Sequence, residues 1–142
     1  MTNIKQLLDT KGREVLAIGP DDTVFDAIKK MADHNVGSLV VLDGKHLIGI
    51  ITERLYARNV FLKGRSSLKT IVKEIMSTRV VCVRPEQSVE ECMAVMTEKA
   101  VRHLPVLENK QVIGIISIGD LVKSVIDDQK FTIEQLEHYI SS

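Results

Sequence analysis

The sequence predicts a mixed fold, α/β or α+β, in which a β-α-β-β-α unit occurs twice and the two units form one compact module. The first observation is an internal repeat: residues 15–55 align with residues 80–120 at a constant shift of 65 positions and without a gap. Of these 41 positions, 13 are identical, including Gly-Ile-Ile at 49–51 and 114–116. The second observation is that strand-like and helix-like periods follow in the same order in both copies. Because two copies are too few for a solenoid, we expect a pseudo-twofold pair in which each copy covers the apolar face of the other.

Each copy begins with a short apolar run and continues with an amphipathic helix. The runs are Val15–Ile18 and Val80–Val83, and a proline two positions later ends each of them. A hydroxyl residue followed three positions later by an acidic residue then resembles a capping box. The apolar residues that follow recur at helical spacing on one face. These residues are Thr23, Asp26, Val24, Ile28 and Met31 in the first copy and Ser88, Glu91, Val89, Met93 and Met96 in the second.

Two β-rich runs in each copy predict a hairpin with a short polar turn. A second helix closes each copy and is expected to begin near Glu53 or Ile118. The four runs are Ser38–Leu42, Leu47–Thr52, Leu104–Leu107 and Val112–Ser117.

Other segments flank or join the copies. Residues 2–9 predict a short helix that ends near Gly12, and Leu62–Leu68 is a polar linker. We therefore divide the chain into residues 1–68 (N-terminal helix, first copy and linker), 69–131 (second copy) and 132–142 (C-terminal helix).

The C-terminal segment carries its own helix signals. Thr132 and Gln135 have the spacing of a capping box and predict a separate helix to about Ile140. Ile133, Leu136 and Ile140 form an apolar stripe along it. Two interpretations stay open for this stripe: packing on its own chain, or a contact between two copies in a dimer.

Composition limits the classes of partner. Lys and Arg total 19 and Asp and Glu total 19, so the formal net charge is zero and the basic excess typical of a nucleic-acid binder is absent. No apolar run approaches the ~18–20 residues that span a bilayer, and the N-terminus has no signal-peptide stretch. We expect a cytoplasmic protein that binds neither nucleic acid nor membrane.

The sequence carries no signature of catalysis. It lacks a P-loop, a G-x-G-x-x-G motif, a nucleophile with a paired base and a pair of carboxylates with separate roles, so we predict no enzyme. Cys82 and Cys92 have no partner at metal-ligand spacing, so neither a zinc site nor a metal requirement is predicted. We interpret both as small buried hydrophobic residues; a redox role is the alternative.

The repeated unit resembles the CBS (cystathionine-β-synthase-type) domain, and the resemblance covers nearly the whole chain. The Lys11–Val15 start and the stretch 56–67 are similar to a subgroup of small stand-alone bacterial proteins with a tandem pair of CBS domains. The motifs that carry the resemblance are Val36–Asp43 with Gly49–Thr52 and Val101–Val106 with Gly114–Asp120. The resemblance implies paired domains with two clefts, disc-shaped homodimers, and binding of AMP, ADP, ATP, NAD or S-adenosylmethionine. Without an attached effector domain, such a protein would act in trans on an effector protein that is unknown.

The residues around the second helix of the second copy suggest the chemistry of the site. Ser117 is a plausible N-cap, and Asp120 lies in the first turn, where the helix dipole favours a carboxylate. From spacing alone, a cap and a first-turn acid are sufficient interpretations. The resemblance adds that the carboxylate would accept hydrogen bonds from the two ribose hydroxyls.

The remaining residues of the predicted site are assigned by type. Apolar residues and a glycine would form a slot for the adenine, and basic residues would bind the phosphate. Of the ligands, AMP is favoured, with NAD, ADP or ATP as alternatives. The predicted ligand-binding residues are Asp120, Ser117, Arg102, His103, Ile115, Ile116, Gly114, Lys11, Arg13, Leu16, Val36 and Gly37.

The two copies differ at the ribose position, because Leu55 stands where the second copy has Asp120. Leucine accepts no hydrogen bond, so the site of the first copy is expected to be weaker. Its predicted residues are Thr52, Arg54, Thr78 and Val81. We therefore predict an adenine-nucleotide sensor; the alternative is a dimeric interaction scaffold that works without a ligand.

Overall fold

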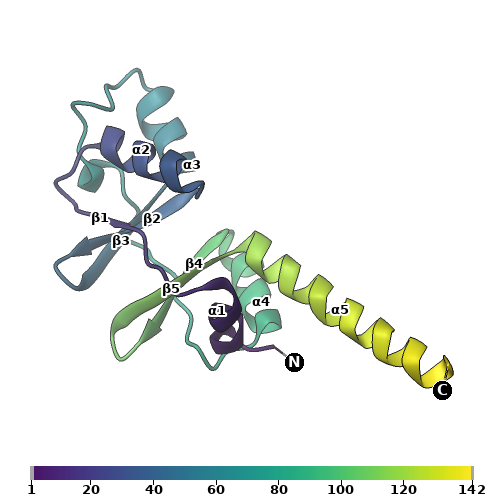
Figure 1. Cartoon of the computed structure of the whole chain (residues 1–142). Coiled ribbons are helices and arrows are strands. Elements are labelled where there is room, and N and C mark those ends of the chain that lie inside the picture. The colour runs from purple at the N-terminus through teal and green to yellow at the C-terminus, as the bar shows by residue number, and fades with distance from the viewer. Residues whose placement is uncertain (1, 142) are drawn as a thin grey trace. The chain divides into compact units, whose positions relative to one another are not determined.

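Residues 2–141 are described by the structure, a computed structural model, and they form two compact units (Figure 1). The first unit comprises residues 15–80, and the second combines residues up to 14 with residues from 81 onward. This grouping differs from the expected division, which placed the N-terminal helix with the first copy. The physical reason is that Ile4, Leu7 and Leu8 pack into the core of the second copy.

The elements follow the order expected from the repeat. The first unit contains β1 (Ala17–Ile18), α2 (Val24–His34), β2 (Ser38–Asp43), β3 (His46–Thr52), α3 (Glu53–Tyr56), the π-helical turn η1 (Ala57–Phe61) and the 3₁₀ turn η2 (Val72–Glu74). The second contains α1 (Ile4–Lys11), α4 (Val89–Lys99), β4 (His103–Glu108), β5 (Gln111–Ser117) and α5 (Ile118–Ser141).

The two hairpins have the same register. In β2–β3, Leu39 pairs with Ile51, and in β4–β5 the equivalent Leu104 pairs with Ile116. Each ladder also shifts at the same place, after Val41 in the first copy and after Val106 in the second. The predicted mixed fold with two equivalent β-rich units is therefore confirmed, and all four predicted strands of the hairpins are present.

The predicted strand Val80–Val83 is wrong, because only a single bridge between Val83 and Val106 forms there. In the first copy, β1 pairs with β2 partly through the Val40 N–H, which donates to the Leu16 carbonyl at 3.3 Å. The second copy has Pro105 at the position of Val40. Proline has no N–H to donate, so this rung of the ladder is missing.

The long helices of the two copies begin and end in the same way. The Thr23 hydroxyl accepts the N–H of Asp26 in α2, and Ser88 forms a complete capping box with Glu91 in α4. Both helices stop at a residue in the left-handed conformation, Asn35 with φ 53° and Ala100 with φ 54°.

Each unit has its own apolar core, and each core takes residues from the segment that precedes the other copy. In the second unit this segment is α1, whose Leu8 packs against Gly114 of β5. In the first unit it is the stretch around η2, whose Met76 packs against Gly49 of β3. The residue at 49 or 114 is a glycine because a Cβ there would lie 2.7 Å from the packed side chain.

The C-terminal helix differs from the prediction, because α5 runs without a break from Ile118 to Ser141 (Figure 1). The hydroxyl of Thr132 caps no new helix and instead donates to the Asp128 carbonyl at 3.0 Å. No glycine or proline lies between residues 120 and 141, so nothing interrupts the backbone ladder. None of the helices in residues 2–141 combines the length and apolar content that a membrane crossing requires.

Candidate ligand sites

A charged cluster lies where β5 passes into α5. The Ser117 N–H donates to Asp120 Oδ2 at 2.8 Å, and the Asp120 N–H donates to Ser117 Oγ at 3.2 Å, which is a reciprocal cap. Lys11, the last residue of α1, extends its Nζ to 2.6 Å from Asp120 Oδ2 and also donates to the Ile115 carbonyl. The structure thus brings together four of the predicted site residues, Lys11, Ile115, Ser117 and Asp120, from the three elements α1, β5 and α5.

The carboxyl of Asp120 is held in its ionised form. Its partial burial acts to raise its pKa, but the hydrogen bond from Lys11, the Ser117 N–H, the Lys11 charge and the Ser117 hydroxyl together lower it below the ordinary value. The Asp120 side chain remains 25% exposed. It is therefore a negative hydrogen-bond acceptor that a ligand from solvent can reach.

Arg102 and His103 lie beside this junction. The carbonyl of Arg102 accepts the N–H of Ile118 at 2.9 Å, and His103 pairs with Ser117 across the hairpin. The Arg102 side chain is exposed and His103 is half-buried. Arg13 behaves differently: its guanidinium pairs with Asp9 at 2.8 Å on the exposed end of α1.

Two residues predicted for the adenine slot have packing roles instead. Gly114 was interpreted as a place where a flat base approaches the backbone, but the Leu8 side chain occupies that face. Ile116 is fully buried in the core, so its side chain is not available to a ligand. Ile115 is half-buried, and it is its carbonyl that takes part in the cluster through Lys11.

Asp120 and Lys11 also line a groove of about 670 Å³ between α1 and α5. The sequence did not predict the other groove residues, although α5 contributes four of them at helical spacing from Asp120. The helical spacing of polar residues after Asp120 was visible in the sequence. Without knowledge of where α1 packs, however, this pattern could not be distinguished from a solvent-exposed helix face. The remaining lining residues are Thr2, Gln6, Leu7, Thr10, Lys123, Ser124, Asp127 and Asp128.

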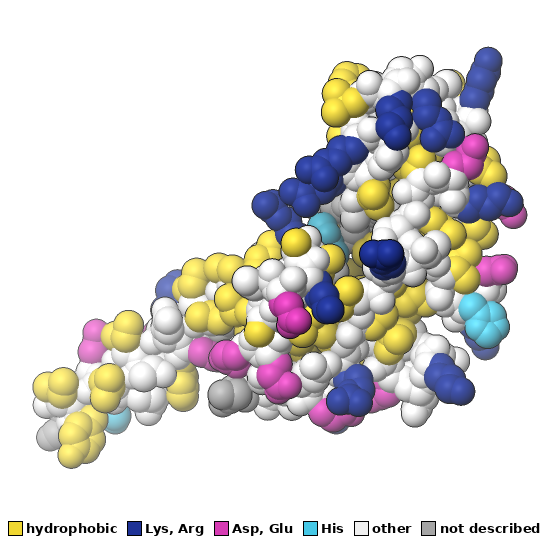
Figure 2. Space-filling model, turned by 180° about the vertical axis from the view of Figure 1, so that it is seen from behind, with side chains coloured by type: hydrophobic (Ala, Val, Ile, Leu, Met, Phe, Trp, Pro, Cys, Tyr) yellow, Lys and Arg dark blue, Asp and Glu magenta, His cyan; other side chains and the backbone are white. Residues whose placement is uncertain are grey.

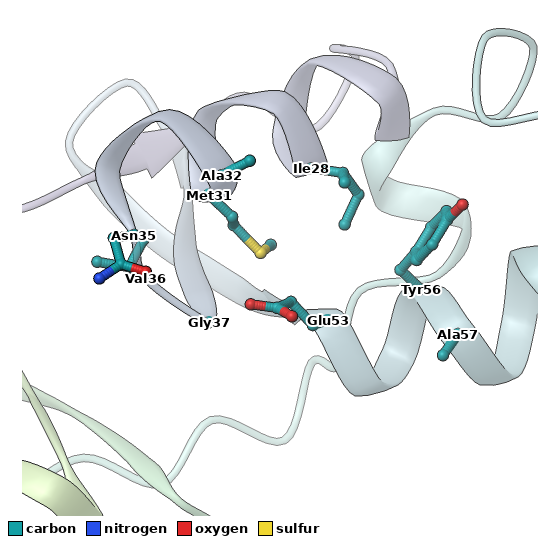
Figure 3. Close-up of a pocket in the computed structure, with 9 residues that line it drawn as sticks. All are labelled: Ile28, Met31, Ala32, Asn35, Val36, Gly37, Glu53, Tyr56 and Ala57. Atoms are coloured by element: carbon teal, nitrogen blue, oxygen red, sulfur yellow. The ribbon is translucent and has the colours of Figure 1, made fainter.

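The first unit has a cavity of about 530 Å³ beside the turn from β3 into α3. It lies between the end of α2 and the start of α3, and Figure 3 shows Met31 and Glu53 extending toward each other across it. Of the predicted residues, Val36 and Gly37 line this cavity. The prediction missed Ile28, Met31, Ala32, Asn35, Glu53, Tyr56 and Ala57.

The other residues predicted for the first copy are not gathered around this cavity. Thr52 caps α3 by accepting the Leu55 N–H at 3.1 Å, and Arg54 and Thr78 are exposed. Leu16 packs against the core of the first unit and Val81 against that of the second. Leu16, Val36 and Gly37 belong to a different unit from Asp120.

The cysteine thiols have the character of packing residues. Cys92 is buried, and burial, with a contribution from the Glu91 charge, raises the pKa of its thiol to about 11. Burial also raises the pKa of Cys82, which is half-buried. Thiols with raised pKa are poor nucleophiles at neutral pH. Within residues 2–141, no group of three or more His, Cys, Asp or Glu residues is placed to hold a metal ion.

Comparison with known proteins identifies the class of protein. The CBS domain family matches residues 5–58 and residues 72–127. The CBS domain-containing protein CBSX3, mitochondrial, of Arabidopsis thaliana is 40% identical over 148 residues, which cover 98% of this chain and 72% of the relative. The chain therefore belongs to the CBS-domain family, with two copies of the domain.

Solved structures show the same architecture. The CBS-domain containing protein ATU1752 of Agrobacterium tumefaciens is 40% identical, with a TM-score of 0.83 over 87% of this chain and 98% of that one. The CBS domain pair of protein MJ0100, solved in complex with 5′-methylthioadenosine and S-adenosyl-L-methionine, shares the fold at 22% identity and a TM-score of 0.80, covering 90% of this chain and 98% of that one.

Proposed function

We propose that this protein is a regulatory CBS-domain pair that binds an adenosyl ligand through Asp120, performs no catalysis and acts in trans on a partner protein. The observation that carries the proposal is the Asp120 carboxylate, fixed at the start of α5 by the Ser117 N–H and still partly exposed. The ligands of the MJ0100 domain pair, both adenosyl compounds, support the ligand class.

The geometry leaves room for a ribose at this carboxylate. Both hydrogen bonds that it accepts go to Oδ2. A carboxylate has about four acceptor positions on its two oxygens, so two vicinal hydroxyls can be added without breaking the cap. Arg102 lies next to this junction with an exposed side chain and would pair with a phosphate. AMP is therefore the first ligand to test, followed by ADP, ATP and NAD.

The test is calorimetric titration of the wild-type protein with AMP, ATP, NAD and S-adenosylmethionine, repeated on two matched variants. Asp120→Ala should weaken binding by roughly 10- to 150-fold, because a lost hydrogen bond to a charged group costs about 1.5–3 kcal/mol. Leu55→Ala, the same position in the first copy, should leave that affinity unchanged. Circular dichroism on both variants checks the fold.

Two outcomes would overturn the proposal. Full binding by Asp120→Ala would show that this carboxylate is not the ribose acceptor. If no adenosyl ligand binds the wild-type protein, the scaffold that works without a ligand becomes the better interpretation.

We also propose that the protein works as a homodimer in the cytoplasm. The proposal of a homodimer is based on the resemblance to CBS-domain pairs, and the proposal of a cytoplasmic location is based on the sequence pattern. Light scattering at micromolar concentration checks the dimer, which should have about twice the chain mass of 15.9 kDa.

A further inference from the structure

Helix α5 has two apolar faces, and only one of them packs on its own unit. Leu121 is fully buried and Val125 packs against the core of the second unit. On the adjoining side of the helix, Ile118, Val122 and Ile126 are 36%, 41% and 45% exposed, although this part of the helix lies against its unit. The outward face therefore borders the packed face but is not covered by its own unit.

The outward face continues along the end of α5. After Val125, no residue up to Ser141 is buried. Ile133, Leu136 and Ile140 are 54%, 57% and 81% exposed, and Figure 2 shows hydrophobic side chains along this end of the helix. A helix end of this length is marginal in water without tertiary contacts, so it needs a partner that covers its apolar side.

The exposed apolar residues have the spacing of a coiled coil. Ile126, Ile133 and Ile140 recur every seven residues, and Val122 and Leu136 lie on the same seam four residues before a member of that series. In heptad terms, isoleucine fills position a, and valine or leucine fills position d. In parallel coiled coils, β-branched residues at a with leucine at d favour two strands. The packing of the stripe on its own chain, left open by the sequence, is not what the structure shows.

Gln129 decides the orientation and the partner. It occupies the d position between Val122 and Leu136 and is the one polar residue on the seam from 122 to 140. In a parallel pair of identical helices it faces its own copy, and two amides can hydrogen-bond each other. In an antiparallel pair centred on Ile133 and Leu136 it would face Ile140 and lose that partner.

We propose that α5 forms a parallel, two-stranded coiled coil with the α5 of a second copy of this chain, along the seam from Val122 to Ile140. A lipid surface is a poorer occupant, because residues 126–141 carry four carboxylates and one lysine, and anionic lipids repel this charge.

A symmetric disulfide tests the pairing directly. Leu136→Cys is introduced into the full chain with Cys82→Ser, and Phe131→Cys serves as the control. The control residue is similarly exposed, 63% against 57%, but lies outside the seam. A disulfide needs Cβ atoms about 3.5–4.5 Å apart, which a parallel register provides for residues of the same number at d. Under mild oxidation at micromolar concentration, Leu136→Cys should cross-link at least about tenfold faster than the control, because the paired helices raise the effective concentration.

A second change separates this seam from any other dimer contact. Ile133→Asp, added to Leu136→Cys, should abolish the cross-link, whereas Phe131→Asp should leave it intact. Three results would overturn the proposal: equal cross-linking of the control, a cross-link that survives Ile133→Asp, or preferential linking of Ile133→Cys chains to Leu136→Cys chains, which indicates an antiparallel pair.

Discussion

The junction between β3 and α3 in the first unit and the junction between β5 and α5 in the second have one backbone frame and two different chemistries. In both, a hydroxyl caps the helix: Thr52 accepts the Leu55 N–H at 3.1 Å, and Ser117 accepts the Asp120 N–H at 3.2 Å. In the first copy the Gly37 carbonyl accepts the N–H of Glu53 at 3.1 Å, and in the second the Arg102 carbonyl accepts the N–H of Ile118 at 2.9 Å. The frame is therefore set by the repeat, while single side chains on it determine the chemistry of each junction.

The side chains divide the two roles. The second copy has Asp120, which forms a charged cluster with Lys11, and Leu121, which is fully buried. At the equivalent positions the first copy has Leu55, which carries no charge, and Tyr56, which is half-buried and lines a cavity. The comparison teaches that the two copies share the cap and the hairpin, while the second has a charged cluster at this place and the first has an open cavity.

The largest expected effect concerns Leu121, the residue after Asp120, and Tyr56, its equivalent in the first copy. Leu121→Ala should lower the free energy of unfolding by about 2–5 kcal/mol, because it leaves a cavity in a filled core. Tyr56→Ala, at the same position of the first copy, should cost about 1 kcal/mol, since its side chain already borders open space. Urea denaturation of both variants measures the difference. Equal losses would show that the two junctions are packed alike.

The next largest effect concerns Gly114 and Gly49, against which Leu8 of α1 and Met76 near η2 pack. Gly114→Ala and Gly49→Ala should each destabilise the protein by about 1–3 kcal/mol through overpacking. The three atoms nearest to the added Cβ at 114 all belong to the Leu8 side chain, whereas at 49 the added Cβ meets Met76 and also lies 3.0 Å from the Ser77 carbonyl oxygen.

A double-mutant cycle separates these two cases. Leu8→Ala should offset most of the strain of Gly114→Ala. Met76→Ala should offset less of the strain of Gly49→Ala, because the backbone contact with Ser77 stays in place. Equal offsets in the two cycles would contradict this assignment of the clash.

Much of the fold could be predicted from the sequence, because the repeat, the alternating strands and the polar turns all encode local structure. The hairpins lie where they were expected, and the spacing of Ser117 and Asp120 correctly predicted an N-cap with a first-turn acid. The predictions that were wrong concern features that depend on contacts between distant segments or on a single backbone atom. Val80–Val83 forms no strand because Pro105, on another segment, lacks an N–H.

The candidate sites were harder to predict for the same reason. Lys11 was among the predicted residues, but its contact with Asp120 depends on α1 packing in the second unit, 109 residues away in sequence. The cavity of the first unit depends on how far Tyr56 fills its position, which no spacing pattern reports. Thr132 illustrates the opposite case, in which a local pattern is present but has no structural effect. Its capping-box spacing lies inside the uninterrupted helix α5, so no new helix begins there.

The smallest expected effect is a difference in acid sensitivity between the two junctions, because in the second Asp120 bonds both the Ser117 N–H and Lys11, whereas the first has Leu55 at this position. The folded protein lowers the pKa of Asp120, so this group stabilises the fold above its unfolded pKa of about 4, and the contribution is lost as the pH falls through the lower folded value. Lys11 and Asp120 are 38% and 25% exposed, and solvent screening limits the effect to below about 1 kcal/mol. Asp120→Asn should therefore flatten the decline in the free energy of unfolding below pH 4, as measured by urea denaturation at a series of pH values. Lys11→Met should flatten it less, because the Ser117 N–H still stabilises the carboxylate. Leu55→Asn, the matched change in the first copy, should leave the acid limb as it is in the wild type, and an unchanged limb in Asp120→Asn would contradict the predicted role of the cluster.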